Sequence, residues 1–281
     1  MTGAEALGIA VSRLKEAGVR DPAVDARVLL ASVLGIDRAR LLVVAGEELP
    51  IGCEVDYESH VAARVERKPV SQIIGYREFY GRRFKICSAV LDPRPETERL
   101  VEVALEKPFS RVLDLGTGSG CILLTLLAEN SAATGLGVDC SDPALGVAQK
   151  NAILLTLAKN VKFANSNWFE NVNGCFDLIV SNPPYISATE MNDLSREVRD
   201  WEPRIALTPE GDGLGAYRSI IRDAARFLNE DGRILLEIGP TQASAVTELL
   251  QASGFEKINV WQDIDGRDRV VETTKTRKQL D

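Results

Sequence analysis

The sequence predicts an α/β protein: a seven-stranded, mostly parallel sheet preceded by a small helical region. Three observations lead to this fold class. From about residue 110, short apolar segments alternate with helical segments, which is typical of a parallel sheet with helical crossovers. The last two apolar segments are joined only by "IDGR", a connection short enough to make an antiparallel pair. Residues 1–75 instead place apolar side chains at helical spacing.

Residues 1–75 are expected to fold as a helical domain. The helical segments are "AEALGIAVSRLKEAG", "DPAVDARVLLASVLG" and "DYESHVAARVERKP". Gly18 and Gly35 stand where the first two helices should end. Asp21 and Pro22 suit the start of the second helix, because Asp is a good N-cap and Pro fits the first helical position. The third segment contains the single histidine of the chain, His60, which we expect on the surface.

Residues 76–90 are predicted to form a connecting β-hairpin. The stretch "GYREFYGRRFKICSAV" alternates aromatic or apolar residues with charged ones around Gly81. Its basic residues are Arg77, Arg82, Arg83 and Lys85. They form either a strip that docks a partner or, as we favour, a solvated face of the hairpin.

Residues 91–281 are expected to carry the sheet. The predicted strands are 111–115, 134–139, 161–165, 176–181, 233–239, 257–263 and 268–274, with helices between the first six. The antiparallel strand should lie near the C-terminal end of the sheet. The tail, residues 275–281, is predicted to be frayed.

Composition limits the function classes. With 45% hydrophobic and 26% charged residues among 281, the chain is an ordinary globular protein that can bury a large core. No apolar run approaches the ~20 residues of a membrane span, and the N-terminus lacks the layout of a signal peptide. We therefore expect a cytoplasmic protein without a membrane partner. A single histidine argues against catalysis by a Ser-His or Cys-His pair. Five scattered cysteines without a C-x-x-C motif predict reduced thiols and no metal site.

The charge is unevenly distributed along the chain. Residues 1–90 carry 13 basic and 12 acidic side chains, whereas the remainder carries 20 basic and 29 acidic ones. An acidic second part is poorly suited to a phosphate backbone, because Lys and Arg supply most nucleic-acid affinity. No direct nucleic-acid substrate is therefore expected.

The segment "VLDLGTGSGCILLTLL" reads as a buried strand, a glycine turn and a helix. The turn consists of Gly116, Thr117, Gly118, Ser119 and Gly120. It matches neither G-x-G-x-x-G nor the phosphate loop that ends in G-K-[ST]. Glycines here let backbone N–H groups approach a ligand at the carboxyl end of the strand. Asp139 ends the next strand, where an acidic residue accepts hydrogen bonds from ribose hydroxyls.

A nucleoside-containing ligand follows from this pattern, with NAD and S-adenosylmethionine as the main candidates. The G-x-G-x-G spacing favours S-adenosylmethionine, since a dinucleotide calls for the wider spacing. Asn167 and Trp168 follow the third strand, where an adenine edge and face would sit. We expect Trp168 to contact adenine; its alternative role is a core or hinge aromatic.

"DLGTGSG", Asp139 and "NPPYI", in this order, resemble class I S-adenosylmethionine-dependent methyltransferases that act on a planar nitrogen. More specifically, the chain is similar to the release factor glutamine methyltransferase family. The further matches are "QIIGYREFYG", "LDPRPETERLVE", "RDWEPRIAL", "DGLGAYRSI", "LLEIG" and "GRDRVV". The resemblance implies a Rossmann-like methyltransferase sheet, S-adenosylmethionine as methyl donor, and methylation of the glutamine in the Gly-Gly-Gln motif of peptide chain release factors. The helical domain at 1–75 would then bind the protein substrate.

The "NPPY" stretch, Asn182 to Tyr185, has a physical rationale for such chemistry. A carboxamide nitrogen is a poor nucleophile, so it must be held in line with the methyl group. The Asn182 side-chain carbonyl and the Pro183 backbone carbonyl are expected to accept the two N–H groups of the target amide. Pro183 and Pro184 restrict the backbone, and Tyr185 is expected to cover the flat face of the amide. No strong general base is required, because the methylated nitrogen can lose its proton to solvent.

Two further points concern the resemblance. "RPETE", Arg94 to Glu98, should start a helix beside the cofactor, with Thr97 and Glu98 facing the pocket; a helix-capping cluster is the competing interpretation. Asn167 stands where the family more often has Asp, which weakens its assignment to the adenine amino group.

Two other function classes compete with a glutamine methyltransferase. A nucleic-acid methyltransferase acting on adenine or guanine amino groups could use the same "NPPY" clamp, because a base amino group is also planar. It would need base extrusion and a basic channel, which the sequence does not indicate. A non-catalytic S-adenosylmethionine-binding protein would have no reason to keep both motifs.

Overall fold

The computed structural model describes residues 1–275, which divide into two compact units. The first unit contains Met1–Tyr76 together with Ser195–Trp201. The second contains Arg77–Leu194 and the chain from Glu202 onward. Apart from Lys275, the tail predicted to be frayed lies outside the described residues. Within residues 1–275, no helix is both long and apolar enough to cross a membrane.

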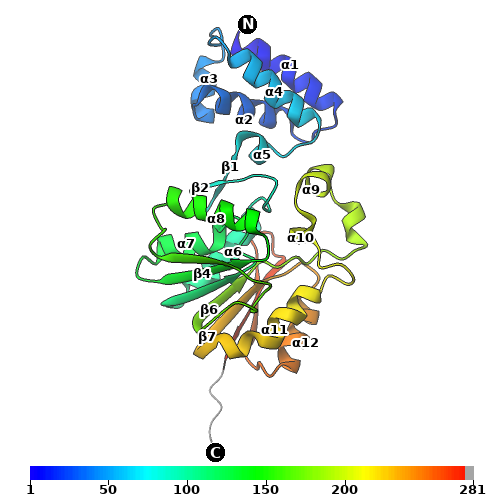
Figure 1. The fold of residues 1–281 in the computed structure, drawn as a ribbon. Helices are drawn as coiled ribbons and strands as arrows, with labels where there is room; N and C mark the ends of the chain where they lie inside the picture. The colour runs from blue at the N-terminus through cyan, green and yellow to red at the C-terminus, as the bar shows by residue number, and fades with distance from the viewer. Residues whose placement is uncertain (276–281) are drawn as a thin grey trace, which may run out of the picture. The chain divides into compact units, whose positions relative to one another are not determined.

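The first unit is helical (Figure 1). Its elements are α1 (Gly3–Glu16), α2 (Pro22–Leu34), α3 (Arg38–Val44), α4 (Cys53–Val65), α5 (Val70–Ile74) and, from a distant part of the sequence, α9 (Arg196–Trp201). The apolar faces of α1, α2 and α4 enclose a core that contains Leu14, Leu29, Leu30 and Val61. The predicted helices are therefore present, whereas α3 and α5, of only seven and five residues, were not predicted.

Local signals explain where these helices begin and end. Asp21 and Pro22 occupy the N-cap and first positions of α2 as predicted, although the Asp21 side chain makes no capping hydrogen bond. Gly35 ends α2 in the left-handed conformation, at φ +65°, where a Cβ would be strained. His60 is half-buried rather than on the surface, and burial lowers its pKa.

The short helix α9 is held in the first unit by charge. Glu197 accepts from Nη2 of Arg64 at 3.0 Å and lies 2.7 Å from Nη2 of Arg67. Burial alone would raise the pKa of Glu197, but the hydrogen bonds from Arg67 and Arg64 outweigh it and bring the pKa to about 2. The indole N–H of Trp201 also donates to the Glu66 carbonyl oxygen at 3.2 Å.

The second unit is built on the seven-stranded sheet that the sequence predicts. Its strands are β3 (Arg111–Leu115), β4 (Thr134–Asp139), β5 (Val161–Asn165), β6 (Phe176–Ser181), β7 (Leu228–Glu237), β8 (Ile258–Gln262) and β9 (Asp268–Thr274). Their spatial order is β5-β4-β3-β6-β7-β9-β8. Strand β9 runs antiparallel to both its neighbours, and the other pairs are parallel. The order reverses between β3 and β6, and ligands of open α/β sheets bind at such a switch point.

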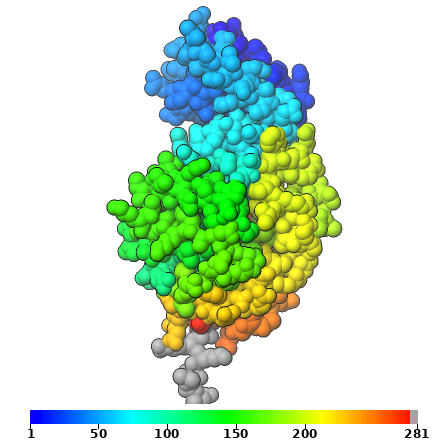
Figure 2. Space-filling view, viewed as in Figure 1, coloured from blue at the N-terminus to red at the C-terminus, as the bar shows by residue number. Residues whose placement is uncertain are grey.

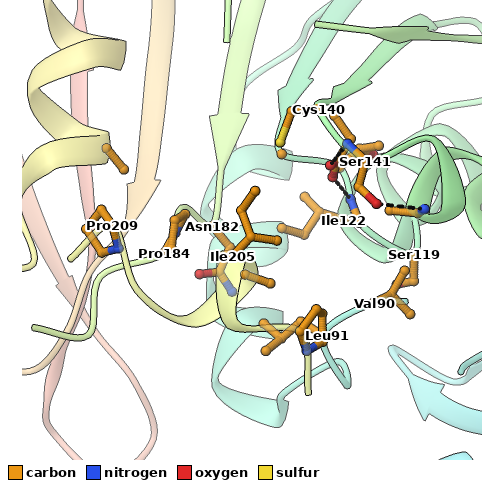
Figure 3. A pocket seen from close by; sticks show the side chains of 18 of the residues that line it. Val90, Leu91, Ser119, Ile122, Cys140, Ser141, Asn182, Pro184, Ile205 and Pro209 are labelled. Atoms are coloured by element: carbon orange, nitrogen blue, oxygen red, sulfur yellow. Dashed lines mark hydrogen bonds between the residues drawn. The ribbon is translucent and has the colours of Figure 1, made fainter. Parts of the chain in front are cut away.

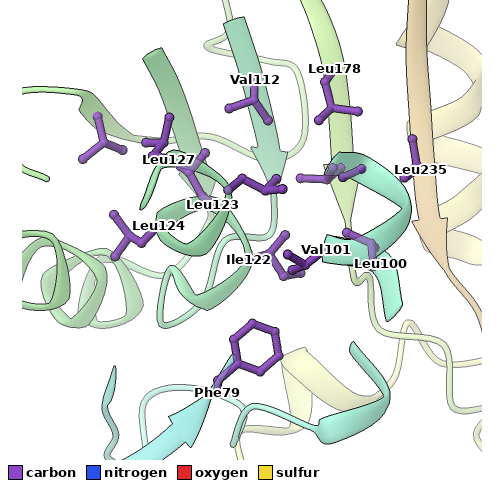
Figure 4. Packing of buried hydrophobic residues seen from close by; sticks show 14 of the residues in the cluster. Phe79, Leu100, Val101, Val112, Ile122, Leu123, Leu124, Leu127, Leu178 and Leu235 are labelled. Carbon is purple, nitrogen blue, oxygen red and sulfur yellow. The ribbon is translucent and has the colours of Figure 1, made fainter. Parts of the chain in front are cut away.

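Helices cover both faces of the sheet (Figure 1). They are α6 (Glu98–Leu105), α7 (Cys121–Glu129) and α8 (Asp142–Leu154) on one face, and α11 (Gly215–Phe227) and α12 (Ala243–Ala252) on the other. Successive strand residues point to opposite faces. Val112 packs under α6 and α7 (Figure 4), whereas Leu113 belongs to the cluster under α11. The glycine turn follows β3 and "NPPY" follows β6. Because these two buried strands are parallel neighbours, both turns begin at the same edge of the sheet.

One predicted helix is missing. Residues 166–175 between β5 and β6 form turns, although helices were expected between all of the first six strands. The connection is too short for a full crossover helix, and it buries Phe169 and Val172 in the core instead. Between β6 and β7, where a helix was predicted, the chain forms a 3₁₀ turn, Glu190–Asp193, followed by α9, α10 (Arg204–Leu207) and α11.

The predicted hairpin is confirmed as β1 (Tyr76–Phe79) and β2 (Arg82–Lys85). Tyr80 and Gly81 both have positive φ, +49° and +70°, as a two-residue hairpin turn of the primed type requires. Its arginines meet acidic side chains. Nη2 of Arg82 lies 2.6 Å from Oε1 of Glu129, and Nε of Arg83 lies 3.3 Å from Oε1 of Glu78. Nη1 of Arg77 lies 4.0 Å from Oδ2 of Asp92.

Candidate active site

A cavity of about 450 Å³ opens at the carboxyl ends of β3, β4 and β6, within the second unit. Figure 3 shows its residues: Ser141 and Cys140 lie at one end, Pro184 and Pro209 at the other, and Asn182 between them. Ala144 of α8 and Ala216 of α11 also line it. In Figure 2 the green surface, to which α8 belongs, borders the yellow surface, to which α11 belongs. The two predicted motifs therefore share one cavity.

The glycine turn forms the wall at the first end. Gly116, Gly118 and Gly120 have φ of +71°, +55° and +78°, so each position would strain any other residue. The carbonyl oxygen of Ser119 is fixed by Asn151 of α8, whose Nδ2 donates to it at 2.9 Å. Four of the five predicted turn residues line the cavity, and Gly120 does not.

Asp139 lies beside this turn, as predicted, and already has backbone partners. Its Oδ2 accepts from the Gly118 N–H at 2.9 Å, and its Oδ1 accepts from the Ser141 N–H at 2.9 Å. Each carboxylate oxygen has a further lone pair, so Asp139 can also accept from a ligand hydroxyl. The carboxylate thus joins the glycine turn to the start of α8.

Trp168 lines the same end of the cavity and has a strained backbone. Its φ is +51°, which is an outlier for a bulky side chain. The Ser166 hydroxyl donates to the Trp168 carbonyl oxygen at 2.8 Å and accepts from the Asn171 N–H, which fixes the turn. Asn167 also lines the cavity, and its side-chain nitrogen donates to Glu170 at 2.9 Å.

A buried carboxyl supports the glycine turn from below. Asp114 is 1% exposed and accepts from the Thr117 hydroxyl at 2.7 Å. Burial raises the pKa of Asp114 to about 7, against the lowering effect of the Thr117 hydrogen bond. This side chain therefore titrates near neutral pH rather than near 4.

The "NPPY" stretch forms the middle of the cavity. Asn182 and Pro184 line it, and the Asn182 side-chain nitrogen donates to the Thr97 hydroxyl at 3.2 Å. The preceding residue, Ser181, donates its hydroxyl to the Leu115 carbonyl oxygen at 2.7 Å. This hydrogen bond ties the end of β6 to the end of β3, so the two motifs are held in register.

Pro183 and Tyr185 are not among the residues that line the cavity. Pro183 is buried, and the Tyr185 ring packs against the core cluster under α11 and α12. The Tyr185 carbonyl oxygen accepts from the side-chain nitrogen of Gln242 at 2.9 Å, while Gln242 accepts from the Gly239 N–H. The structure thus places Tyr185 behind the turn, where it anchors the turn, rather than over the cavity, where the sequence led us to expect it.

"RPETE" forms the 3₁₀ turn Pro95–Thr97 and leads into α6, as expected. Thr97 and Arg94 line the cavity, but Glu98 points elsewhere and accepts from the Tyr80 N–H at 2.8 Å. Arg94 contacts both carboxylate oxygens of Glu202, at 2.7 and 2.8 Å. Burial raises the pKa of Glu202 to about 7 despite this neighbouring charge.

The far end of the cavity was missed by sequence reasoning. It is lined by Pro203, Ile205, Ala206, Thr208 and Pro209. Part of this stretch, "RDWEPRIAL", stood out only as a family match, and nothing in its composition marks a site. Gln242 and Asn151 were also missed, because their partners lie far away in sequence. The five cysteines are free, as predicted, and Cys121 and Cys140 line the cavity.

The fold and site together define a class. An open sheet of this strand order, with a glycine turn after β3, an acidic residue after β4 and "NPPY" after β6, is a class I methyltransferase. Residues 5–75 match the family model for the PrmC N-terminal domain, and residues 88–198 match that for the methyltransferase small domain.

Relatives narrow the class to one family. The chain is 52% identical to the release factor glutamine methyltransferase of Cereibacter sphaeroides, over 96% of this chain and 98% of the relative. It is 42% identical to that of Agrobacterium fabrum, over 92% of each chain, and 39% identical to that of Caulobacter vibrioides, over 96% of each. The chain belongs to the release factor glutamine methyltransferase family.

Solved structures confirm the fold alone. A methyltransferase from Pyrococcus furiosus superposes with a TM-score of 0.55 at 15% identity, covering 78% of this chain and all of that one. The hMettl16 catalytic domain, solved in complex with the MAT2A 3′UTR hairpin 6, superposes with a TM-score of 0.57 at 19% identity. It covers 82% of this chain and 83% of that one.

A methyltransferase of this family uses S-adenosylmethionine, and the residues present fit it. The first end of the cavity offers positive-φ glycines without Cβ atoms, a carboxylate with spare acceptor capacity and an indole ring. These groups match an amino-acid portion, a ribose and an adenine. The cavity volume lies within the range usual for small-molecule sites.

Proposed function

We propose that this chain methylates the side-chain amide nitrogen (N5) of the glutamine in the Gly-Gly-Gln motif of peptide chain release factors. The observation that carries this proposal is the 52% identity to a release factor glutamine methyltransferase, which extends over both units. The cavity supports it, because the polar side chain of Asn182 lines the same cavity as the glycine turn and Asp139.

We assign the first end of the cavity to S-adenosylmethionine, which when bound supplies a methyl group on a sulfonium. Gly116, Thr117, Gly118, Ser119 and Gly120 form the wall that the methionine portion approaches. Asp139 accepts from ribose hydroxyls, and Trp168 provides a flat surface for the adenine ring. The strained φ of Trp168 is consistent with such a role, because strain of this kind gathers at ligand sites.

We assign the amide clamp to Asn182 and Pro183. Because the Asn182 nitrogen donates to Thr97, its carbonyl oxygen is the atom left to accept from the substrate amide. The Pro183 backbone carbonyl supplies the second acceptor. Two fixed acceptors stabilise the amide nitrogen as it becomes positive during transfer, without reorganising at that moment. Pro184 keeps the turn rigid, and Tyr185 anchors it.

The reaction needs no dedicated base in this site. As the nitrogen gains the methyl group, its N–H becomes acidic enough to transfer a proton to water. The clamp therefore needs to position and polarise rather than to abstract a proton. This accords with the single histidine, His60, lying in α4 of the first unit.

We also propose that the helical unit binds the release factor, and that neither nucleic acid nor a membrane is a direct partner. An excess of acidic residues beyond residue 90 disfavours a phosphate backbone. A release factor substrate places the enzyme in the cytoplasm, where proteins are synthesised. Binding to DNA or RNA that weakens steeply with salt would contradict this part of the proposal.

The test is transfer of a labelled methyl group. The protein is incubated with labelled S-adenosylmethionine and a release factor, either wild type or with Gln→Ala in the Gly-Gly-Gln loop. We expect label only in the wild-type factor, on the glutamine side chain. Equal labelling of both factors would sink the assignment.

A further inference from the structure

The far end of the cavity has no role in the cofactor site or in the amide clamp described above. We call residues 203–209 the far wall; those that line the cavity are Pro203, Ile205, Ala206, Thr208 and Pro209. All of these except Thr208 have apolar side chains. Among the described residues that line the cavity, Ile205 is the only large hydrophobic one that is exposed, at 62%. An exposed isoleucine in the same cavity as Asn182 points to a surface that a bound molecule covers.

Two contacts fix the far wall to the segments that carry the clamp. Nη2 of Arg94 lies 2.7 and 2.8 Å from the two carboxylate oxygens of Glu202, the residue before the wall. Toward the other end, the Ile186 N–H donates to the Leu207 carbonyl oxygen at 3.0 Å. Arg94 belongs to the "RPETE" stretch that contacts the clamp, and Ile186 directly follows "NPPY". The wall therefore keeps a fixed position relative to the clamp.

The first of these contacts is a largely buried ion pair. The Glu202 side chain is 1% exposed, so water screens its charge little and Arg94 is the partner that balances it. A second pair at this wall, Arg204 with Glu210, has side chains 61% and 57% exposed. An exposed pair of this kind contributes little to stability. The two pairs thus provide a test and its matched control.

The chemistry of a glutamine defines what has to lie beside the clamp. Two methylene groups separate its amide group from the main chain. With the amide held at Asn182 and the methyl donor at the first end, these methylenes have to leave through the remaining part of the cavity. The far wall adjoins the clamp on the side away from the glycine turn (Figure 3). Its apolar side chains suit methylene groups, whose removal from water is favourable.

The same lining suits a nucleic-acid base less well. A base taken out of its stack is held between aromatic or apolar faces. Among the described residues that line the cavity, Trp168 alone is aromatic, and we assign it to the adenine of the cofactor. The described lining thus offers a substrate base no second aromatic face, whereas an aliphatic side chain needs none.

We propose that Ile205 is a specificity-determining residue: its side chain packs against the methylene groups of the target glutamine, and the Arg94–Glu202 pair holds it there. The inference rests on the proposed function, because it takes the substrate to be a glutamine with its amide at Asn182. It explains why an exposed isoleucine stands on a wall that a buried ion pair fixes.

The variants Ile205→Asn and Ile205→Leu test the contact, with Ile264→Asn as the matched control. Ile264 is an isoleucine of the same unit that is 102% exposed and does not line the cavity. We expect kcat/KM for a release factor to fall about tenfold in I205N, as when a methylene contact is lost, with S-adenosylhomocysteine affinity within about threefold of wild type. I205L should keep most of the activity because it keeps the apolar surface, and I264N should match wild type. Wild-type kcat/KM in I205N, or an equal loss in I205L, would overturn the inference.

The role of the ion pair is tested by comparing Glu202→Gln with Glu210→Gln. Hydrogen exchange of residues 203–209 is measured by mass spectrometry; its N–H groups include that of Ala206, which donates to the Pro203 carbonyl oxygen at 2.9 Å. We expect exchange about tenfold faster in E202Q than in wild type and unchanged in E210Q, because a change in a buried pair costs far more than one in an exposed pair. Wild-type exchange in E202Q would contradict the assignment of this pair to the far wall.

A further measurement does not depend on activity. In protein with ¹³C-labelled isoleucine methyl groups, the Ile205 and Ile264 signals are assigned by their loss in I205L and I264N. The protein, saturated with S-adenosylhomocysteine, is mixed with a release factor, either wild type or with Gln→Ala in the Gly-Gly-Gln loop. We expect the Ile205 signal to shift with the wild-type factor and far less with the Gln→Ala factor, and the Ile264 signal to stay unchanged with both.

The two measurements separate the inference from the proposed function. If a glutamine is methylated but the Ile205 signal responds equally to both factors, the inference fails while the proposed function stands. If no glutamine is methylated but the Ile205 signal distinguishes the two factors, the proposed reaction fails while the contact between Ile205 and the glutamine stands.

Discussion

The two turns that meet in the cavity treat the backbone in opposite ways. Gly116–Gly120 after β3 bends through three positive-φ glycines, whereas Asn182–Tyr185 after β6 contains two prolines. In the proposed function, the first turn approaches the cofactor with its main chain, which requires the absence of Cβ atoms. The second is proposed to present oxygen acceptors at fixed points, which requires a backbone with little conformational freedom. Binding and positioning therefore place opposite demands on neighbouring strands.

Each turn also rests on a hydrogen-bonded pair that contains a buried threonine, and the two pairs span different distances in the sequence. Thr117 and Asp114 are three residues apart, so the glycine turn is supported from within its own segment. In the second pair, the Asn182 side-chain nitrogen donates at 3.2 Å to the hydroxyl of Thr97, 85 residues earlier in the sequence. The local pair can be guessed from the motif "DLGTGSG", while the distant pair exists only in the folded protein.

The largest effect should come from removing the acceptor in the second turn. We expect Asn182→Ala to lower kcat by about 10²–10³, because one preorganised acceptor in the transition state is lost. Affinity for S-adenosylhomocysteine, measured by titration calorimetry, should change less than about threefold. A parallel loss of turnover and of S-adenosylhomocysteine affinity would contradict the assignment of substrate positioning to the second turn and of cofactor binding to the first.

The corresponding change on the cofactor side is made at Asp139, which lies beside the first turn. Asp139→Ala removes the carboxylate that accepts from the Gly118 and Ser141 N–H groups. We expect the Kd for S-adenosylhomocysteine to rise about 10- to 100-fold, since hydrogen bonds to charged groups contribute about 1.5–3 kcal/mol each. At saturating S-adenosylmethionine, kcat should fall much less than in N182A. If kcat drops as far as in N182A, the two turns do not differ in the way described.

A smaller effect is expected behind the second turn. Gln242→Ala leaves the Tyr185 carbonyl and the Gly239 N–H without their present partner. We expect kcat to fall about tenfold and the protein to lose about 1–3 kcal/mol of stability, the usual cost of an unsatisfied buried group. Gln251→Ala, at an exposed glutamine of α12, is the matched control and should match wild type in both. An effect on cofactor affinity alone would contradict the assignment of Gln242 to the second turn.

The smallest effect concerns stability and pH. Because burial raises the pKa of Asp114 from 3.8 to about 7, the folded protein holds a proton that the unfolded chain releases at lower pH. This side chain therefore contributes less stability as the pH rises from about 4 to 7. The stability of Asp114→Asn relative to wild type should be higher at pH 8 than at pH 6 by about 1.4 kcal/mol. Urea unfolding at both pH values measures it, and an equal difference at the two would refute it.

The sheet could be predicted from sequence because its signals are local. Each strand is a short apolar run that ends at a glycine, a polar residue or a proline, and all seven were located. The prediction of a helix at residues 166–175 was wrong, because the strand–helix alternation was assumed to continue through a connection that is too short for a crossover helix. Strand β7 also begins at Leu228, five residues before the predicted start, through a stretch of polar residues.

The site could be predicted only where the chemistry lies in one segment. The glycine turn, Asp139 and Asn182 follow strand ends, so topology alone brings them together. Thr97 and Gln242 act through contacts over long sequence distances, and a threonine or glutamine carries no local mark of that role. Tyr185 illustrates the converse: its motif suggested a ring over the substrate, but tertiary packing turned the ring into the core.

The assignment of Ser195–Trp201 to the helical unit has a practical consequence for anyone who wants to divide this protein. The chain crosses between the units three times, at residues 76, 195 and 201, so no single cut separates them. A fragment that begins at Arg77 would keep Glu197 but lose both of its arginine partners. It would also keep the indole of Trp201 without the carbonyl that it bonds. An independent catalytic fragment therefore has to be designed as a deletion and a loop replacement together.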